Sequence, residues 1–223
     1  MLRSVSLLAF AGAIIVSVTA CGSSGGASPS GGKPTLDQLP TIQFVGNATC
    51  PTSGASPYFT TSNGTVKPAP VNSLPAVGQA VDEMPHTHVT PPAQITYNHT
   101  PPTSGCHYNL GYGDAPVQAG VYDQAVDPQY WVHNLEHGYI VVLYNCPSGC
   151  SNEFQQLRSW YHSLSPSRGV PYARALVLPY TNMNVPFAAV SWDWYDPMPV
   201  FSLDEVKKFY ANHENNPAER NAP

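Results

Sequence analysis

The pattern of apolar and polar positions is regular only in the second half of the chain. Asp127-Pro128 suits the start of a helix, because proline is tolerated at the first helical position, and Gly138 suits its end. We therefore expect a short helix from about 128 to 137. The run YIVVLY at 139–144 is rich in branched and aromatic side chains and predicts a strand.

The remainder of this half predicts two more helices and further strands. A helix starting at Ser151 or Asn152 and ending at Leu164 has an apolar stripe at helical spacing, and a last helix is expected over 202–212. Strands are expected at 175–178, at 187–194 and, after an Asp196-Pro197 turn, around Val200. These elements predict a fold of the α/β or α+β class, a small mixed sheet with two or three helices packed on it.

The first half of the chain lacks such regularity. Over 36–80 Pro, Ser, Thr and Gly are frequent and apolar stretches are brief, which predicts a loop-rich, extended arm with at most one or two short strands. Residues 81–124 then provide histidine-bearing loops and no long helix. We expect the globular domain to span 81–219.

The N-terminus has the organisation of an export signal. An apolar run over 7–18 is shorter than the about 20 residues that a membrane span needs, so residues 1–20 are expected to be a secretory signal peptide. The sequence VTAC that ends at Cys21 resembles the lipobox of bacterial lipoproteins, which implies acylation of Cys21, with palmitate as a typical chain, and anchoring to the extracytoplasmic face of the cell membrane. The Gly- and Ser-rich residues 21–35 would form a flexible tether. The alternative is an ordinary signal peptide that ends near a cysteine.

Composition narrows the range of partners. Charged residues make up 10% of the chain, against about 25% in ordinary soluble proteins. The net charge is −5 and no basic cluster is present. Nucleic acid and anionic lipid headgroups are therefore not expected to bind. The 24 prolines indicate a chain stiffened in its loops, while the hydrophobic content of 42% is that of a folded protein.

Four of the five cysteines remain once Cys21 is set aside as the lipid site. In an oxidising compartment an even number of cysteines predicts disulfides, here two. We favour Cys50 with Cys106 and Cys146 with Cys150, because the second pair closes a short Pro-Ser-Gly turn. The other connectivities stay open at this point.

Two strings carry a family resemblance, PPTSGCHY at 101–108 and VHNLEHGYIVVLY at 132–144. Together with shorter matches they resemble domain-of-unknown-function family 3105 over roughly 84–219. That family consists of bacterial proteins, often secreted or membrane-attached, and it implies no particular activity. Cys106 stands where such proteins commonly have proline, which supports an added disulfide in this chain. The shorter matches are His88-Val89, Tyr97, Gly120-Val121-Tyr122 and Pro217-Ala218-Glu219.

A second resemblance lies downstream. The strand that ends at Tyr144, the Cys146 to Cys150 loop and the helix after it look like a thioredoxin-type layout, in which two cysteines precede a helix and a cis proline faces them. Pro186 would be the counterpart of that proline. The C-x3-C spacing is similar to copper-chaperone members of that superfamily rather than to its C-x2-C redox enzymes.

Histidine spacing suggests a metal site. His133 and His137 are four residues apart, so both imidazoles project from one face of a helix. His86 and His88 alternate in an extended segment and would point the same way. With His107, five imidazoles could share one ion. Glu136 is a candidate ligand, a partner that orients an imidazole, or a base on metal-bound water, and its place differs from that in zinc proteases.

Imidazole-rich sites suit zinc, copper, iron or nickel, and Met84 beside Pro85 and His86 slightly favours copper. Copper or zinc is the expected ion. Each histidine also has a purely structural interpretation, as a buried hydrogen-bonded ring or a partner of the helix dipole. Six of the eight histidines lie within 86–137, which favours the shared site. The others weighed, His99, His162 and His213, are expected at the surface.

Three functions compete on these grounds. The first is a lipid-anchored, extracytoplasmic protein that binds copper or zinc through the histidines. The second is a thiol-disulfide protein or copper chaperone that uses Cys146 and Cys150. The third is a non-catalytic surface binding domain whose histidines are structural and would lie dispersed in the fold.

Overall fold

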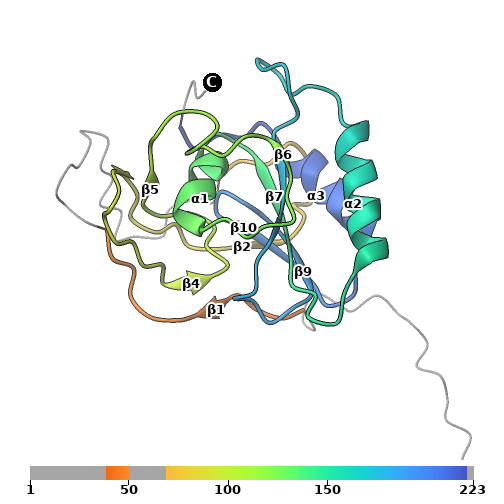
Figure 1. The fold of residues 1–223 in the computed structure, drawn as a ribbon, viewed down its shortest axis with the longest axis horizontal. Coiled ribbons are helices and arrows are strands. Elements are labelled where there is room, and N and C mark those ends of the chain that lie inside the picture. The colour runs from red at the N-terminus through yellow and green to blue at the C-terminus, as the bar shows by residue number, and fades with distance from the viewer. Residues whose placement is uncertain (1–38, 51–68, 220–223) are drawn as a thin grey trace, which may run out of the picture. The chain divides into compact units, whose positions relative to one another are not determined.

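A mixed sheet of six strands forms the centre of the protein (Figure 1). The computed structural model describes residues 39–50 and 69–219, which belong to one compact unit. The expected signal peptide, Cys21 and the expected tether lie outside the described residues. Within those residues, no helix has the length and apolar character needed to cross a membrane. The strands lie in the order β2 (Gln79–Ala80), β10 (Trp194–Met198), β9 (Phe187–Ser191), β7 (Ile140–Tyr144), β8 (Ala175–Pro179) and β6 (Gly120–Val121).

Helices cover both faces of this sheet, α1 (Pro128–Glu136) on one and α2 (Ser151–Ser163) with α3 (Leu203–His213) on the other (Figure 1). The central strand β7 contacts both helical layers, because successive side chains of a strand point to opposite faces of the sheet. Val141 and Leu143 pack with α1, whereas Ile140 and Val142 pack with α2 and α3. A strand buried on both faces needs the continuous apolar run that the sequence has there. The expected fold class is confirmed.

The start and end of α1 follow from local sequence. Pro128 occupies the first turn, where its missing N–H removes no helical hydrogen bond. His137 is the C-terminal cap, and Gly138 follows with a φ of 78°, a left-handed conformation that glycine adopts at little cost. The helix therefore stops one turn after His133, and the chain turns directly into β7.

The expected strand over 187–194 is wrong. The strand β9 ends at Ser191, and Trp194 begins β10, which pairs antiparallel with β9 through Met198. Asp193 makes the tight turn with a φ of 63°, which aspartate tolerates better than branched residues do. Pro197 lies within β10 rather than in a turn. Among the described residues β2 pairs only with the first part of β10, and a strand with an open edge accepts proline.

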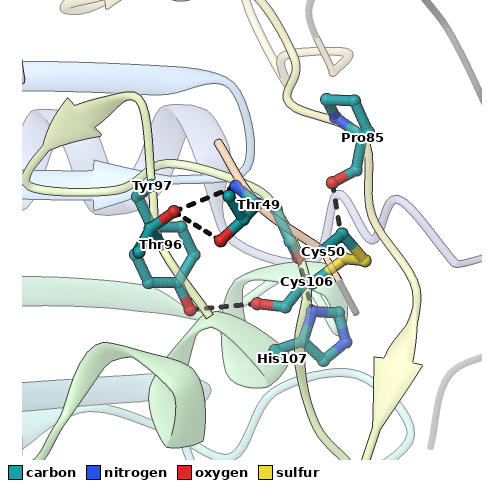
Figure 2. Close-up of a disulfide and its surroundings, with 8 residues drawn as sticks. Thr49, Cys50, Pro85, Thr96, Tyr97, Cys106 and His107 are labelled. Atoms are coloured by element: carbon teal, nitrogen blue, oxygen red, sulfur yellow. Dashed lines mark hydrogen bonds between the residues drawn. A yellow bond between two sulfur atoms is a disulfide. The ribbon is translucent and has the colours of Figure 1, made fainter. Parts of the chain in front are cut away.

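Short two-residue strands pair the arm with the histidine-bearing loops, and pair these loops with one another. The strand β1 (Gln43–Phe44) pairs with β4 (His99–Thr100), and β3 (His88–Val89) pairs parallel with β5 (His107–Tyr108). The disulfide between Cys50 and Cys106 joins the end of this part of the arm to the residue before β5 (Figure 2). The Tyr97 hydroxyl donates to the carbonyl oxygen of Cys106 at 3.0 Å, which fixes the same point again (Figure 2). The chain that enters β5 is therefore held from two sides.

The C-terminal half contains the strand, cysteine loop and helix that suggested a thioredoxin-type layout. A parallel β7-α2-β8 unit is followed by the antiparallel strands β9 and β10 and by α3. A disulfide joins Cys146 to Cys150, the residue that caps α2. The structure thus contains both favoured disulfides. It differs from the comparison at Pro186, because the cis bonds of the described residues precede Pro75, Pro92, Pro101 and Pro116 only.

Candidate metal centre

Three imidazoles and one carboxylate meet between α1 and the strands β3 and β5. The ring centroids of His88, His107 and His133 are 4.8 to 5.0 Å apart. One donor atom from each ring and one oxygen of Glu136 all lie within 4.8 Å of one another. His107, His133 and Glu136 are buried, and His88 is partly exposed. A surface binding domain with structural histidines would have its imidazoles dispersed, so this function is not favoured.

The fold places these side chains by pairing and by helical spacing. In the β3 and β5 pair, His88 stands directly opposite His107, so both side chains leave the strands on the same side. His133 and Glu136 are three residues apart on α1 and share one helical face. Because α1 packs on β5, that face meets the two strand histidines. Three segments of the chain, β3, β5 and α1, thus contribute side chains to one candidate site.

The hydrogen bonds fix which ring nitrogens point inward. Nδ1 of His107 lies 2.8 Å from the carbonyl oxygen of Gly105, and Nδ1 of His133 lies 2.8 Å from that of Tyr108. A carbonyl oxygen only accepts, so both Nδ1 atoms carry the proton and donate it. Nε2 of each ring is therefore the nitrogen that faces the interior of the cluster. Such second hydrogen bonds are how proteins orient imidazoles that bind metals.

Glu136 lies at the centre of the charge pattern. Its Oε2 atom is 3.0 Å from Nε2 of His88 and 3.1 Å from Nε2 of His107. Burial alone would raise the pKa of the Glu136 carboxyl, but the charges and hydrogen bonds of His107 and His88 hold this pKa far below its ordinary range. The hydrogen bond to Glu136 raises the pKa of His88 against the opposing effect of burial. The carboxylate is therefore ionised at neutral pH.

The helical histidines are held neutral. Burial, reinforced by the neighbouring His107, His137 and His88, lowers the pKa of His133 to about 3. Burial also lowers the pKa of His137 to about 4, although Glu136 acts in the opposite direction. Neutral imidazole is the form that binds metal ions. At neutral pH both rings are thus ready to act as ligands.

His137 belongs to a second, overlapping group. Its Nε2 atom is 3.1 Å from Nε2 of His133 and 3.4 Å from Oε2 of Glu219. Donor atoms of Glu136, His137 and Glu219 again all lie within 4.8 Å of one another. Sequence reasoning missed Glu219 as a site residue, since it is 82 positions from His137 and shares no spacing pattern with it. The one sequence signal for Glu219 was that Pro217-Ala218-Glu219 is among the shorter matches to the family.

The residues between the site histidines on α1 have structural roles. The side chain of Asn134 is fully buried and makes two hydrogen bonds of 2.8 Å with the backbone of Val117, one to its N–H and one to its carbonyl. Leu135 is fully buried in the core on the α1 face of the sheet. The string HNLEHG therefore contains both residues of the candidate site and buried residues that hold neighbouring segments against α1.

A family model described as "Protein of unknown function (DUF3105)" matches residues 88–223. The chain belongs to this family. The matched part contains every member of both groups described above and begins after His86. Searches of curated proteins and of solved structures gave no match.

In this DUF3105 protein the remaining histidines lie apart from the centre. Nδ1 of His86 is 3.5 Å from Oε1 of Glu83, and its ring packs edge-on against Trp192, 5.0 Å between centroids. The regular strand begins only at His88, so strict alternation does not apply to His86. His162 lies exposed on α2, as expected.

The expectation that His99 and His213 lie at the surface is wrong. His99 is buried where β4 pairs with β1, and its Nε2 atom accepts the backbone N–H of Thr103 at 3.1 Å. His213 packs against Phe209, 4.2 Å between ring centroids, and donates to the carbonyl of Val77 at 2.7 Å. Burial lowers the pKa of each ring to about 4. Both are therefore neutral, structural histidines.

Met84 also has a structural role. It is 1% exposed, and its sulfur accepts the backbone N–H of Asn98 at 3.4 Å. The thioether is thus engaged with backbone in the core, and the argument for copper over zinc loses its basis.

The centre opens on one side into a cavity of about 460 Å³. Three tyrosines, Tyr112, Tyr139 and Tyr172, form part of its wall, and Tyr112 stacks on Tyr172 at 4.9 Å. His88, His133, His137 and Glu219 line the same cavity. Solvent and small ligands therefore have a path to the imidazoles.

Proposed function

We propose that this DUF3105 protein is a lipid-anchored, extracytoplasmic protein that binds a transition metal ion, zinc or copper, through His88, His107, His133 and Glu136. Imidazole nitrogen with one carboxylate oxygen is a donor set that both ions accept. The polypeptide would be held by Cys21 on the outer face of the cell membrane. The protein would acquire, buffer or deliver the ion there.

The observation that carries the proposal is the convergence of four donor groups on one point. His107 and His133 donate their Nδ1 protons to backbone carbonyls, so Nε2 of each ring is the atom that faces His88 and Glu136. Nε2 of His88 and Nε2 of His107 both lie within hydrogen-bond distance of Oε2 of Glu136, at 3.0 and 3.1 Å. A metal ion would take the place of a proton between these atoms, because metal binding to imidazoles releases protons.

The spacing supports the same assignment. At zinc–ligand distances of about 2.1 Å, the corners of a tetrahedron are about 3.4 Å apart. Donor atoms that already lie within 4.8 Å of one another reach this arrangement through small side-chain movements. The site would then use four protein ligands, as structural or storage sites for zinc do.

Metal analysis tests this proposal. We expect the full chain, purified in detergent without a histidine tag and dialysed against zinc, to retain at least one ion per chain. The double variant His107→Ala, His133→Ala removes two of the four ligands and should lose it. The variant His162→Ala removes an exposed histidine on α2 and should bind as the wild type does. Equal metal content in the double variant and the wild type would sink the proposal.

The proposed location has its own support and test. The two disulfides suit an oxidising compartment, and the sequence VTAC suits lipid attachment at Cys21. We expect the wild type in the membrane fraction with acyl chains on Cys21, detected by mass spectrometry of the N-terminal peptide. The variant Cys21→Ser should be found unacylated. An unmodified Cys21 in the membrane-associated wild type would contradict this location.

A second candidate function rests on Cys146 and Cys150. Both are only partly buried at the start of α2, and they line a cavity of 410 Å³ with Tyr144 and Phe154. A disulfide at a helix start can exchange with thiols, because the helix dipole stabilises the thiolate. We expect mild reductant to open this disulfide before the one of Cys50 and Cys106, since Cys106 is 2% exposed. Resistance of the Cys146 bond, measured by alkylation and mass spectrometry, would assign it a structural role.

A further inference from the structure

We infer that a second metal ion binds beside the first, held by Glu136, His137 and Glu219. This inference rests on the proposed metal-binding function and extends it to a centre of two ions. Glu136 belongs to both ligand groups, so its carboxylate would bridge the two positions. Carboxylates bridge ions of this kind when the ions lie about 3.5 to 4 Å apart.

The distances favour two adjacent positions. Nε2 of His137 approaches Nε2 of His133 to 3.1 Å and Oε2 of Glu219 to 3.4 Å. His137 nevertheless lies outside the group in which His88, His107, His133 and Glu136 share donor atoms within 4.8 Å. It joins Glu136 and Glu219 in a group of its own. The two groups share Glu136, so two ions on either side of its carboxylate would use all these donors.

Glu219 is placed by the backbone, although its side chain is 44% exposed. The N–H groups of Ala218 and Glu219 both donate to the carbonyl oxygen of Glu136, at 2.9 and 3.3 Å. The N–H of Asn215 donates to the carbonyl oxygen of Gly138 at 3.0 Å. The segment that carries Glu219 is therefore fastened to the end of α1, directly beside His137.

Gly138 shows how close this contact is. A Cβ atom at Gly138 would lie 3.0 Å from the backbone nitrogens of Asn216 and Pro217. Only glycine allows the C-terminal segment to approach this far. The position of Glu219 next to the site is thus a consequence of backbone packing and not of a mobile side chain alone.

The two positions would differ in character. The first has four protein ligands, of which His107 is fully buried. The second has three, and two of them, His137 and Glu219, line the 460 Å³ cavity. A metal ion with three protein ligands keeps a coordination position for water or substrate. The first ion would therefore be held tightly, and the second would exchange and would bind a small anion or oxygen ligand from the cavity.

Counting bound ions tests the inference. The full chain, purified without a histidine tag and equilibrated with zinc, is expected to hold two ions. Glu219→Gln and Glu219→Ala are expected to hold one. Glu214→Gln is the matched control, because it removes a carboxylate from the same segment that belongs to neither ligand group, and it should keep two. Circular dichroism would establish that all the variants are folded.

Electron paramagnetic resonance of the copper-loaded protein gives an independent measure. Two Cu²⁺ ions about 3.5 to 4 Å apart should couple, so the wild type should show a weakened, broadened signal. Glu219→Ala should show the signal of one isolated ion. A single ion in the wild type, or an unchanged count in both Glu219 variants, would overturn the second position and leave the proposed function standing. No bound ion at all would overturn both.

Discussion

Replacing Asn134 by leucine should destabilise the protein strongly, although it introduces no change of charge and little change of size. The Asn134 side chain is fully buried and makes two hydrogen bonds of 2.8 Å to the backbone N–H and carbonyl of Val117. Leucine would leave both backbone groups buried without partners. Each such loss costs about 1 to 3 kcal/mol, so we expect the free energy of unfolding to fall by about 2 to 6 kcal/mol.

The assay is urea unfolding of the metal-free protein with intact disulfides, followed by tryptophan fluorescence. Asn152→Leu is the control, because Asn152 is exposed on α2 and its replacement should change the free energy of unfolding by less than about 0.5 kcal/mol. Asn134→Asp keeps an acceptor for the N–H of Val117 but faces its carbonyl with a second acceptor, so it should also be destabilised. A loss below about 1 kcal/mol for Asn134→Leu would refute the reasoning, since a single unpaired group already costs that much.

Three further predictions concern the site and its support. Zinc at a free concentration of about 100 times its Kd should stabilise the wild type by about 2.7 kcal/mol, which corresponds to about 5 to 11 °C in Tm, and calorimetry should find no such shift for His133→Ala. Burial, with the charge of Glu83, raises the pKa of Asp193 from 3.8 to about 8. The native carboxyl then holds its proton more tightly than the unfolded one, and its contribution to stability falls as pH rises through this range. Asp193→Asn should therefore gain stability over the wild type at pH 8 relative to pH 4, and a difference independent of pH would contradict this cause. Gly138→Ala should lower the free energy of unfolding by about 1 kcal/mol or more, because alanine is strained at a φ of 78° and meets the backbone of Asn216.

The elements that the sequence predicts well are those with long, strongly patterned segments. The helix expected over 128–137 is α1, Pro128–Glu136, and the strand expected at 139–144 is β7, Ile140–Tyr144. Proline and glycine mark the ends of this helix. The short run of branched residues at 140–144 is typical of a strand that is buried in a sheet. Local chemistry is sufficient here because it agrees with the tertiary fold.

The sequence could not reveal what depends on distant contacts. The strands β3 and β5 have two residues each, too few for any periodic pattern, yet their pairing brings His88 opposite His107. His213 is buried because its ring packs against Trp194 of β10, 4.9 Å between ring centroids, and donates to the carbonyl of Val77, both far from it in sequence. The approach of Glu219 to His137 likewise depends on how the C-terminal segment folds back onto α1.

The last turn of α1 brings together ligand residues that lie far apart in the sequence. The strand histidines come before it, and Glu219 comes 82 residues after His137. Proteolytic cleavage between α3 and Glu219 would leave α1, α2 and α3 in the protein but would remove one ligand of the proposed second ion. Occupancy of that second position would therefore distinguish an intact chain from one cut after α3.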